Sequence, residues 1–181
     1  MGVYLSARPL DEGAIPGLAT HLRVVEEEFT IIHDGKPAPD VPEQASLRRE
    51  LKRFEDHERE FGKAGHAAFG LWILWDEQQH PLGAVLGSGV ELLSGDVIVS
   101  AFDAAATRQL ADALDQVDDH ELAELFFSSE LREVAEYTDV ERGDDDAAEE
   151  VAMFLEEVTN GPRYLFSFCR EHGLGMIVWA G

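Results

Sequence analysis

The sequence is poor in cysteine, in lysine and in long apolar runs, with one cysteine and three lysines among 181 residues. A single cysteine cannot form an intrachain disulfide, and nothing points to an oxidising compartment. The longest apolar run, Ala67 to Trp75, is far shorter than the about 20 residues that cross a bilayer. The N-terminus lacks the basic and apolar regions of a signal peptide. We therefore expect a cytoplasmic protein without a membrane-spanning segment.

Positive charge is also scarce. Asp and Glu total 37 against 14 Lys and Arg, which gives a net charge of −23. Such a surface repels nucleic-acid phosphates and anionic lipids, so we expect neither as a partner. Two explanations of the acidity stay open: general solubility in an ordinary cell, or adaptation to a high-salt cytoplasm, which would also suit the low lysine content.

The two ends of the chain each predict a core strand. Gly2 to Ala7 and Met176 to Trp179 are short apolar runs rich in strand formers, and Asp96 to Phe102 is a third candidate. Met1, Gly2 and Ser6 also fit an N-myristoylation pattern, which is the alternative interpretation of the first segment. The terminal strand is expected beside Gly2 to Ala7 or beside Val97 to Phe102.

Most of the remaining chain has helical periodicity. The clearest amphipathic set has steps of three and four residues: Ile15, Leu18, Leu22, Val25 and Phe29. A charged helix is expected from Glu43 to Phe61, either as a self-neutralised solvated face or as a docking patch for an acidic partner. A loop should precede it from Thr30 to Glu43. Helix N-caps are predicted at Asp11, Asp103, Asp118 and at Ser128 or Ser129.

The closing passage predicts two helices and a strand. Apolar residues recur at helical spacing after the acidic stretch Asp139 to Glu150. A helix that approaches from the N-terminal side cannot continue through Pro162, because proline lacks the N–H and clashes with the preceding turn. We therefore expect helices from Asp144 to Thr159 and from Pro162 to His172, with Pro162 at the first position of the second. Cys169 falls in the apolar set and should be a core residue. Together these elements predict one α+β domain over residues 1–181, with helices around a small sheet of three or four strands.

Catalytic and metal motifs are missing. The glycines at 83, 87 and 89 fit neither a dinucleotide loop nor a phosphate loop, and no Gly-x-Ser-x-Gly is present. His57-Glu58-Arg59-Glu60 ends in phenylalanine where a zinc motif needs a second histidine. The acidic stretch fails as a calcium loop because Gly143 is one position early. We expect no cofactor and no metal site.

One stretch could line a pocket. The segment from Gly65 to Trp75 is apolar on all sides, which predicts a buried helix or strand. Titratable groups accompany its tryptophans, and aromatic rings beside such groups are common in small-ligand sites. A core element with an aromatic rim would carry the same residues. The candidate ligand-binding residues are His66, Trp72, Trp75, Asp76 and His80.

The order of features resembles the YfbM-like family of bacterial domains of unknown function. The residues that carry the resemblance are Met1-Gly2, the segment from Pro81-Leu82 to Leu86-Gly87, the Val99 to Phe102 strand leading into the Leu110 to Val117 helix, and the close from Tyr164 to Gly181. The resemblance implies a stand-alone bacterial α+β domain, largely helical around a small sheet. It implies no catalytic residue.

Two functions remain open from the sequence. The first is a non-enzymatic acidic binding or regulatory module, of the immunity-protein kind, that docks a basic protein partner; the motive is the charge of −23 without a catalytic motif. The second is a small-molecule enzyme with a pocket around His66, Trp72, Trp75 and His80. We expect the first, and therefore expect that the protein is not an enzyme.

Overall fold

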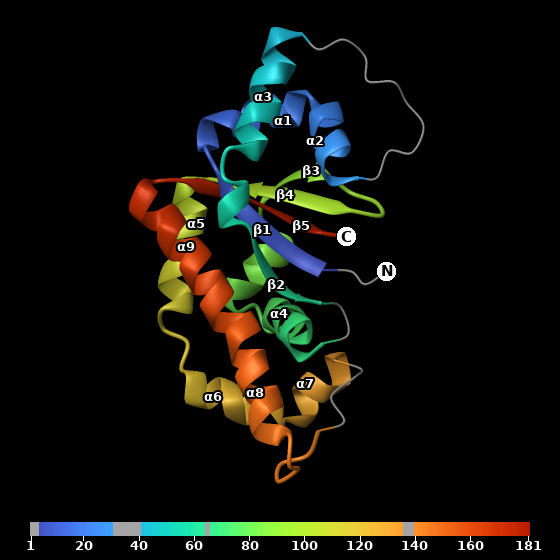
Figure 1. Ribbon diagram of the computed structural model, residues 1–181, viewed down its shortest axis with the longest axis vertical. Coiled ribbons are helices and arrows are strands. Elements are labelled where there is room, and N and C mark those ends of the chain that lie inside the picture. The colour runs from blue at the N-terminus through green and yellow to red at the C-terminus, as the bar shows by residue number, and fades with distance from the viewer. Residues whose placement is uncertain (1–3, 31–40, 64–65, 136–139) are drawn as a thin grey trace.

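A five-stranded antiparallel sheet forms the centre of the computed structural model, which describes residues 4–30, 41–63, 66–135 and 140–181 (Figure 1). The strand order is β2-β1-β5-β4-β3. Helices pack on the sheet, so the predicted α+β class is confirmed, with one strand more than the three or four expected. The strands are β1 (Tyr4–Leu10), β2 (Arg59–Lys63), β3 (Val90–Leu93), β4 (Ile98–Phe102) and β5 (Gly175–Ala180).

The C-terminal strand β5 lies in the middle of the sheet, antiparallel to both β1 and β4. Both neighbours expected for it are therefore present. Alternate side chains of a strand point to opposite faces. Met176 and Val178 accordingly belong to one hydrophobic cluster, and Ile177 belongs to the other. Burial on both faces explains why this segment is a continuous apolar run.

One face of the sheet is covered by helices from the N-terminal third, which lie at the top of Figure 1. They are α1 (Ile15–Thr20), α2 (Leu22–Phe29) and α3 (Pro42–Lys52). The amphipathic segment from Ile15 to Phe29 was expected to be one helix, but it breaks at His21, whose backbone (φ −113°, ψ 57°) is not helical. The break changes the direction of the chain so that both short helices pack on the sheet.

The other face carries the remaining helices. They are α4 (Ala67–Glu77), α5 (Ala104–Leu114), α6 (Asp119–Phe126), α7 (Ser129–Val134), α8 (Ala147–Leu155) and α9 (Gly161–His172). The predicted N-caps Asp103, Asp118 and Ser128 are confirmed, because each side chain accepts a backbone N–H of the first turn. Asp11 also caps, but it begins the 3₁₀ turn Glu12–Ala14 rather than an α-helix.

The prediction of one charged helix from Glu43 to Phe61 was wrong in its second half. α3 ends at Lys52, and Arg59–Lys63 is instead the edge strand β2, paired with β1. The side chain of Phe61, which belongs to this strand, is fully buried. Charged residues at salt-bridge spacing continue past the end of the helix, so the charge pattern alone did not indicate the change from helix to strand. Residues 31–40 of the expected loop lie outside the described residues, and Pro42 and Glu43 already belong to α3.

The first strand is longer than expected. Met1, Gly2 and Val3 lie outside the described residues, but the strand continues through Arg8 and Pro9, which were expected to end it. β1 pairs with β2 only as far as Ala7. Beyond that residue one side of β1 is open, and a proline without an N–H is tolerated at such an edge.

The closing helices are joined by a π-helical turn, Glu156–Asn160. α9 begins at Gly161, so Pro162 lies in its first turn, as the second residue of the helix and not the first residue predicted. The π turn keeps the backbone helical where a gap was expected, and α9 follows it without a break at Gly161. Gly173 ends α9 in the left-handed conformation (φ 63°).

Two further features concern the periphery. β3 was not predicted, because its four residues, with Val90 and Glu91 exposed, show little alternation of buried and exposed side chains.

No helix in the described part of the chain combines the length and apolar character of a membrane span.

Candidate functional site

The helix α4 places the predicted tryptophans, and it is buried almost all round. Trp72 is completely buried, and its indole N–H donates to the carbonyl oxygen of Phe61 at 3.1 Å. Its ring stacks on Phe61 and meets the ring of Trp75 edge-on at 5.0 Å. Trp72 is therefore a core residue that contributes to no cavity wall described below.

His80 follows α4 across a tight turn. Its backbone N–H donates to the carbonyl oxygen of Trp75 at 2.8 Å, and Gln79 adopts a left-handed φ of 56° to allow this. The imidazole then lies over the indole of Trp75, with ring centroids 5.1 Å apart and planes 21° from parallel. The predicted neighbourhood of Trp75 and His80 is thus present in three dimensions.

The tautomer of His80 follows from its role as a helix cap. Nδ1 accepts the backbone N–H of Leu82 at 3.2 Å, at the start of the 3₁₀ helix Pro81–Leu86, called η3. A neutral imidazole that accepts at Nδ1 carries its proton on Nε2. Burial lowers the pKa of His80 below its ordinary value, which favours this neutral form. The free side of the ring is therefore a hydrogen-bond donor.

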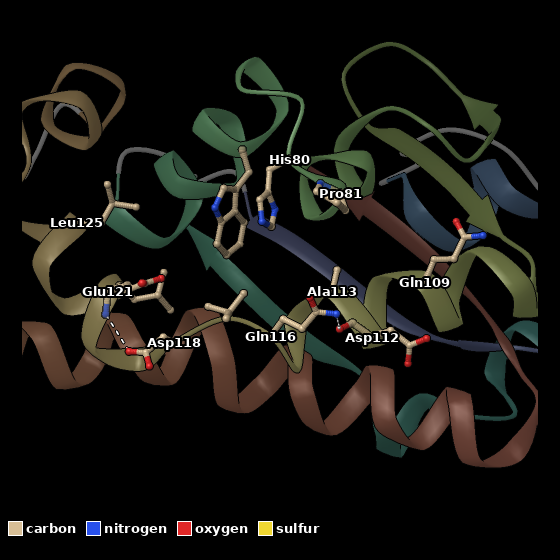
Figure 2. Close-up of a pocket in the computed structure, with 12 residues that line it drawn as sticks. His80, Pro81, Gln109, Asp112, Ala113, Gln116, Asp118, Glu121 and Leu125 are labelled. Atoms are coloured by element: carbon tan, nitrogen blue, oxygen red, sulfur yellow. Dashed lines mark hydrogen bonds between the residues drawn. The ribbon is translucent and has the colours of Figure 1, made fainter.

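Trp75 and His80 form one wall of a cavity of about 580 Å³, which we call the α4–α6 cleft. Figure 2 shows His80 and Pro81 on one side, with Gln116, Asp118 and Glu121 on the facing side. The volume lies within the range of small-ligand sites. The residues of the facing wall, from α5, α6 and the turn between them, are Gln109, Asp112, Ala113, Gln116, Val117, Asp118, Glu121, Leu122 and Leu125.

The polar groups of this wall are acidic or amide. Asp112 is paired with Arg170 at 3.0 Å. Asp118 accepts the N–H groups of His120 and Glu121, which lower the pKa of its carboxyl. Among the described residues the carboxylate of Glu121 forms no ion pair or hydrogen bond. No lysine or arginine of the described residues lines the cleft, so Asp118 and Glu121 have no basic neighbour in its described lining.

The five predicted site residues do not form one site. Trp75 and His80 line the α4–α6 cleft, whereas Trp72 is core and Asp76 lines neither cavity described here. His66 is the N-cap of α4 and His80 follows its C-terminus. Eleven helical residues separate the two histidines by roughly 16 Å, so they cannot act on one small ligand.

His66 instead borders a smaller cavity of about 270 Å³, shared with Glu150 and Glu157 and the apolar side chains of Phe126, Met153 and Phe154. Glu157 comes from the π turn and is half-buried, and burial raises the pKa of its carboxyl against the opposing effect of His66. π turns often occur at functional positions. Here the turn places Glu157 beside the start of α4.

Nucleophile and metal chemistry find no support in the described residues. Cys169 is fully buried, and burial raises the pKa of its thiol to about 12, so the thiolate is not available at neutral pH. Its predicted core role is confirmed. No group of three or more His, Cys, Asp or Glu side chains in the described ranges could hold a metal ion.

Sequence reasoning missed the acidic wall of the cleft. Asp118 and Glu121 have the spacing of a capping box and were assigned to helix capping alone. Asp118 does cap α6, yet it also lines the cleft. The only sequence signal was the capping pattern itself, which says nothing about which helix lies opposite.

Comparisons with known proteins agree on the fold. The crystal structure of YfbM from Escherichia coli, a protein of unknown function, covers 98% of this chain and 98% of its own with a TM-score of 0.58 and 12% sequence identity. At that identity the likeness shows a shared fold alone. No curated protein matches the chain. A family model, "Domain of unknown function (DUF1877)", matches residues 17–179. The resemblance noted in the sequence is confirmed, and the chain belongs to the DUF1877 family.

Proposed function

We propose that this protein is a non-enzymatic acidic binding module that docks a basic protein partner through the α4–α6 cleft and the acidic surface around it. The observation that carries the proposal is the cleft itself: an aromatic wall faces carboxylates, and no lysine or arginine lines it. A regulatory role of the immunity-protein kind would need such a docking site. Charge complementarity of this sort mainly sets association rate and partner choice.

The distribution of charge along the chain also favours docking at the α4–α6 cleft. Residues 104–172, which include both helices of the acidic wall, carry 19 Asp and Glu against five Arg and no Lys, and so hold 14 of the 23 surplus negative charges. The first 103 residues carry 18 acidic against nine basic residues. The surplus is thus concentrated in the helical part that borders the cleft, where it would attract a basic surface.

The arginines near the cleft are already engaged. Arg170 pairs with Asp112 and with Asp115, at 3.0 and 2.6 Å. Arg163 pairs with Asp119 at 2.9 Å. These pairs leave the charge of Glu121 uncompensated by any described cation, so an incoming basic group would not have to displace an internal one.

The enzyme alternative receives less support. His66 and His80 border different cavities, and Trp72 borders neither. The neutral His80 ring presents an N–H to the cleft, because its other nitrogen is occupied by Leu82. A ring in that tautomer can donate a hydrogen bond, but it cannot accept a proton from a substrate without first giving up the cap.

Binding of a short peptide rich in arginine and lysine, measured at low and moderate salt, tests the proposal. We expect the double variant D118N/E121Q to bind more weakly and with a smaller salt dependence, because two cleft charges are lost. Asparagine keeps the N-cap at position 118. The matched control E91Q/D96N removes two charges from exposed positions at the β3–β4 hairpin.

The two double variants have the same net charge, so only the position of the lost charges differs. The control should bind as the wild type does. Equal weakening in both variants would show that the attraction is a property of net charge alone, and no binding by the wild type at low salt would exclude a basic partner. Either result contradicts the proposal.

A further inference from the structure

Trp75 lines the α4–α6 cleft and carries a hydrogen-bond donor without an acceptor among the described residues. The residue is 6% exposed, and its indole N–H donates to no other residue in the described part of the chain. The neighbouring Trp72 satisfies its own N–H with the carbonyl oxygen of Phe61. The indole nitrogen of Trp75 is not fully shielded from solvent, so water or a ligand can supply its acceptor. Trp75 borders the α4–α6 cleft, so a ligand there is in position to supply the missing acceptor.

His80 adds a second donor to the same wall. Its ring stacks on Trp75, and its Nδ1 is held by Leu82, which leaves the N–H at Nε2 on the free side. Two N–H donors from adjacent rings suit a neutral acceptor such as a carbonyl oxygen. An anionic acceptor is disfavoured because the facing wall is negative.

The facing wall offers the complementary groups. Both backbone donors to Asp118 bond to its Oδ1, so Oδ2 remains available. The carboxylate of Glu121 has no described partner. The same wall carries the apolar side chains of Ala113, Val117 and Leu122, which we call the apolar strip. One wall of the cleft thus offers donors, and the other offers carboxylates beside the apolar strip.

We infer that the cleft holds an arginine residue of a basic peptide, with its guanidinium at Asp118 and Glu121 and its backbone carbonyl accepting from the N–H groups of Trp75 and His80. The inference rests on the proposed function and names the group that the site recognises. The aliphatic part of the side chain covers the apolar strip. Arginine suits the site better than lysine, because its planar, weakly hydrated fork can donate to two carboxylates at once.

Three capped tripeptides test this on the full chain: acetyl-Gly-X-Gly-amide with arginine, lysine or citrulline at X. Citrulline has almost the shape of arginine but no charge. Two-dimensional NMR of the ¹⁵N-labelled protein reports binding through the indole N–H resonance of Trp75. We expect that resonance to shift with the arginine peptide, and citrulline to weaken binding by about tenfold or more, as for a lost charged hydrogen bond. Lysine should fall between them.

Variants locate the contact. E121Q should weaken binding of the arginine peptide and leave binding of the citrulline peptide nearly unchanged, because only the arginine peptide carries a charged side chain. E91Q serves as the control and should change neither. The variant W75F removes the N–H but keeps an aromatic ring; if it fails to fold, the indole resonance of the wild type still reports the contact directly.

The possible failures are distinct. If the basic peptide of the previous section binds through Asp118 and Glu121 but the citrulline tripeptide binds as tightly as the arginine one, the inference about arginine is wrong and the proposed function stands. An unshifted indole resonance at saturating arginine peptide also overturns it. If no basic peptide binds at low salt, both the proposed function and this inference fall.

Discussion

Gly83 lies against the backbone of Asp76, so close that a Cβ atom on Gly83 would be 2.3 Å from the backbone nitrogen of Asp76. The contact holds η3 against the end of α4 and so sets the position of His80, the N-cap residue of η3. Because the contacting groups on both sides belong to the backbone, neither can move aside as a flexible side chain can. The absence of a side chain at position 83 is therefore a requirement of the cleft.

The variant G83A should destabilise the protein by about 2 kcal/mol, in the range of overpacked cores. The cause is the displacement of η3 from α4, so the indole resonance of Trp75 should also move. Chemical denaturation and NMR provide the two measurements.

Gly87 provides the matched control, because it follows the same 3₁₀ helix and a Cβ there would meet nothing within 4 Å. G87A should retain nearly the stability of the wild type. A loss in G87A as large as that in G83A would show that η3 tolerates no alanine for reasons other than this contact.

The buried guanidinium of Arg8 connects the sheet to the N-terminal helices. Its side chain is 7% exposed, and it pairs with Glu28 at 3.1 Å, Glu58 at 3.3 Å and Glu55 at 3.7 Å. Arg8 also donates to the carbonyl oxygen of Leu51 at 3.0 Å. Burial raises the pKa of Glu58, and the charge of Arg8 opposes that rise.

The variant R8M should lose about 3 kcal/mol of unfolding free energy at neutral pH, because the carboxylate of Glu28, which is 15% exposed, would lose its closest cation. The loss should shrink as the pH falls and these carboxyls take up protons. Denaturant unfolding at neutral and at acidic pH measures both effects.

Arg53 is the control, an exposed arginine that pairs with Glu50 at 3.0 Å. R53A should cost less than about 1 kcal/mol. If R8M were as mild as R53A, or if its loss grew toward acidic pH, the buried ion cluster would not have the role assigned to it.

The His80 imidazole should make the protein less stable in mild acid. Burial lowers its pKa, so the unfolded chain takes up this proton at a higher pH than the folded protein does. Its contribution to stability is complete above the ordinary value of about 6.5 and is lost as the pH falls through that value toward the lowered pKa. Protonation also removes the acceptor for the Leu82 N–H.

Arginine-peptide binding should weaken over the same pH range, because a protonated His80 adds a positive charge to the cleft. The carboxyls that face it are Asp112, Asp118 and Glu121, and the backbone N–H groups of Glu121 and His120 lower the pKa of Asp118. His120 lies beside Asp118 and is the other imidazole to consider. The variant H80N should remove the pH step in melting temperature and binding, whereas H120N should keep it. The reverse outcome would assign the step to His120.

Several elements were predictable because their signals are local. The N-caps at Asp103, Asp118 and Ser128 depend on a side chain that bonds to its own first turn. The terminal strand was predictable because burial on both faces demands an unbroken apolar run. The edge strand β2 was not predictable, since its residues continue the charge pattern of the helix before it.

Half of the candidate site was predictable for the same reason. Trp75 and His80 are five residues apart, and a helix end followed by a turn brings them together. Asp118 and Glu121 lie about 40 residues further along the chain, and their capping pattern is complete without the cleft. Their place opposite Trp75 depends on how α5 packs on the sheet and against η3 and on how α6 packs against α7 and α8, which no local pattern encodes.

The sequence by itself determined the class of fold, the surplus of negative charge, the strands at or near both ends of the chain and the family resemblance, because composition and short-range periodicity carry these properties. Only the tertiary structure decided that His66 and His80 border separate cavities, that Trp72 is core, and that Trp75 and His80 share a cleft with several carboxylates. The physical reason is that a cleft is made by contacts between elements distant in the chain, and side-chain packing chooses those contacts.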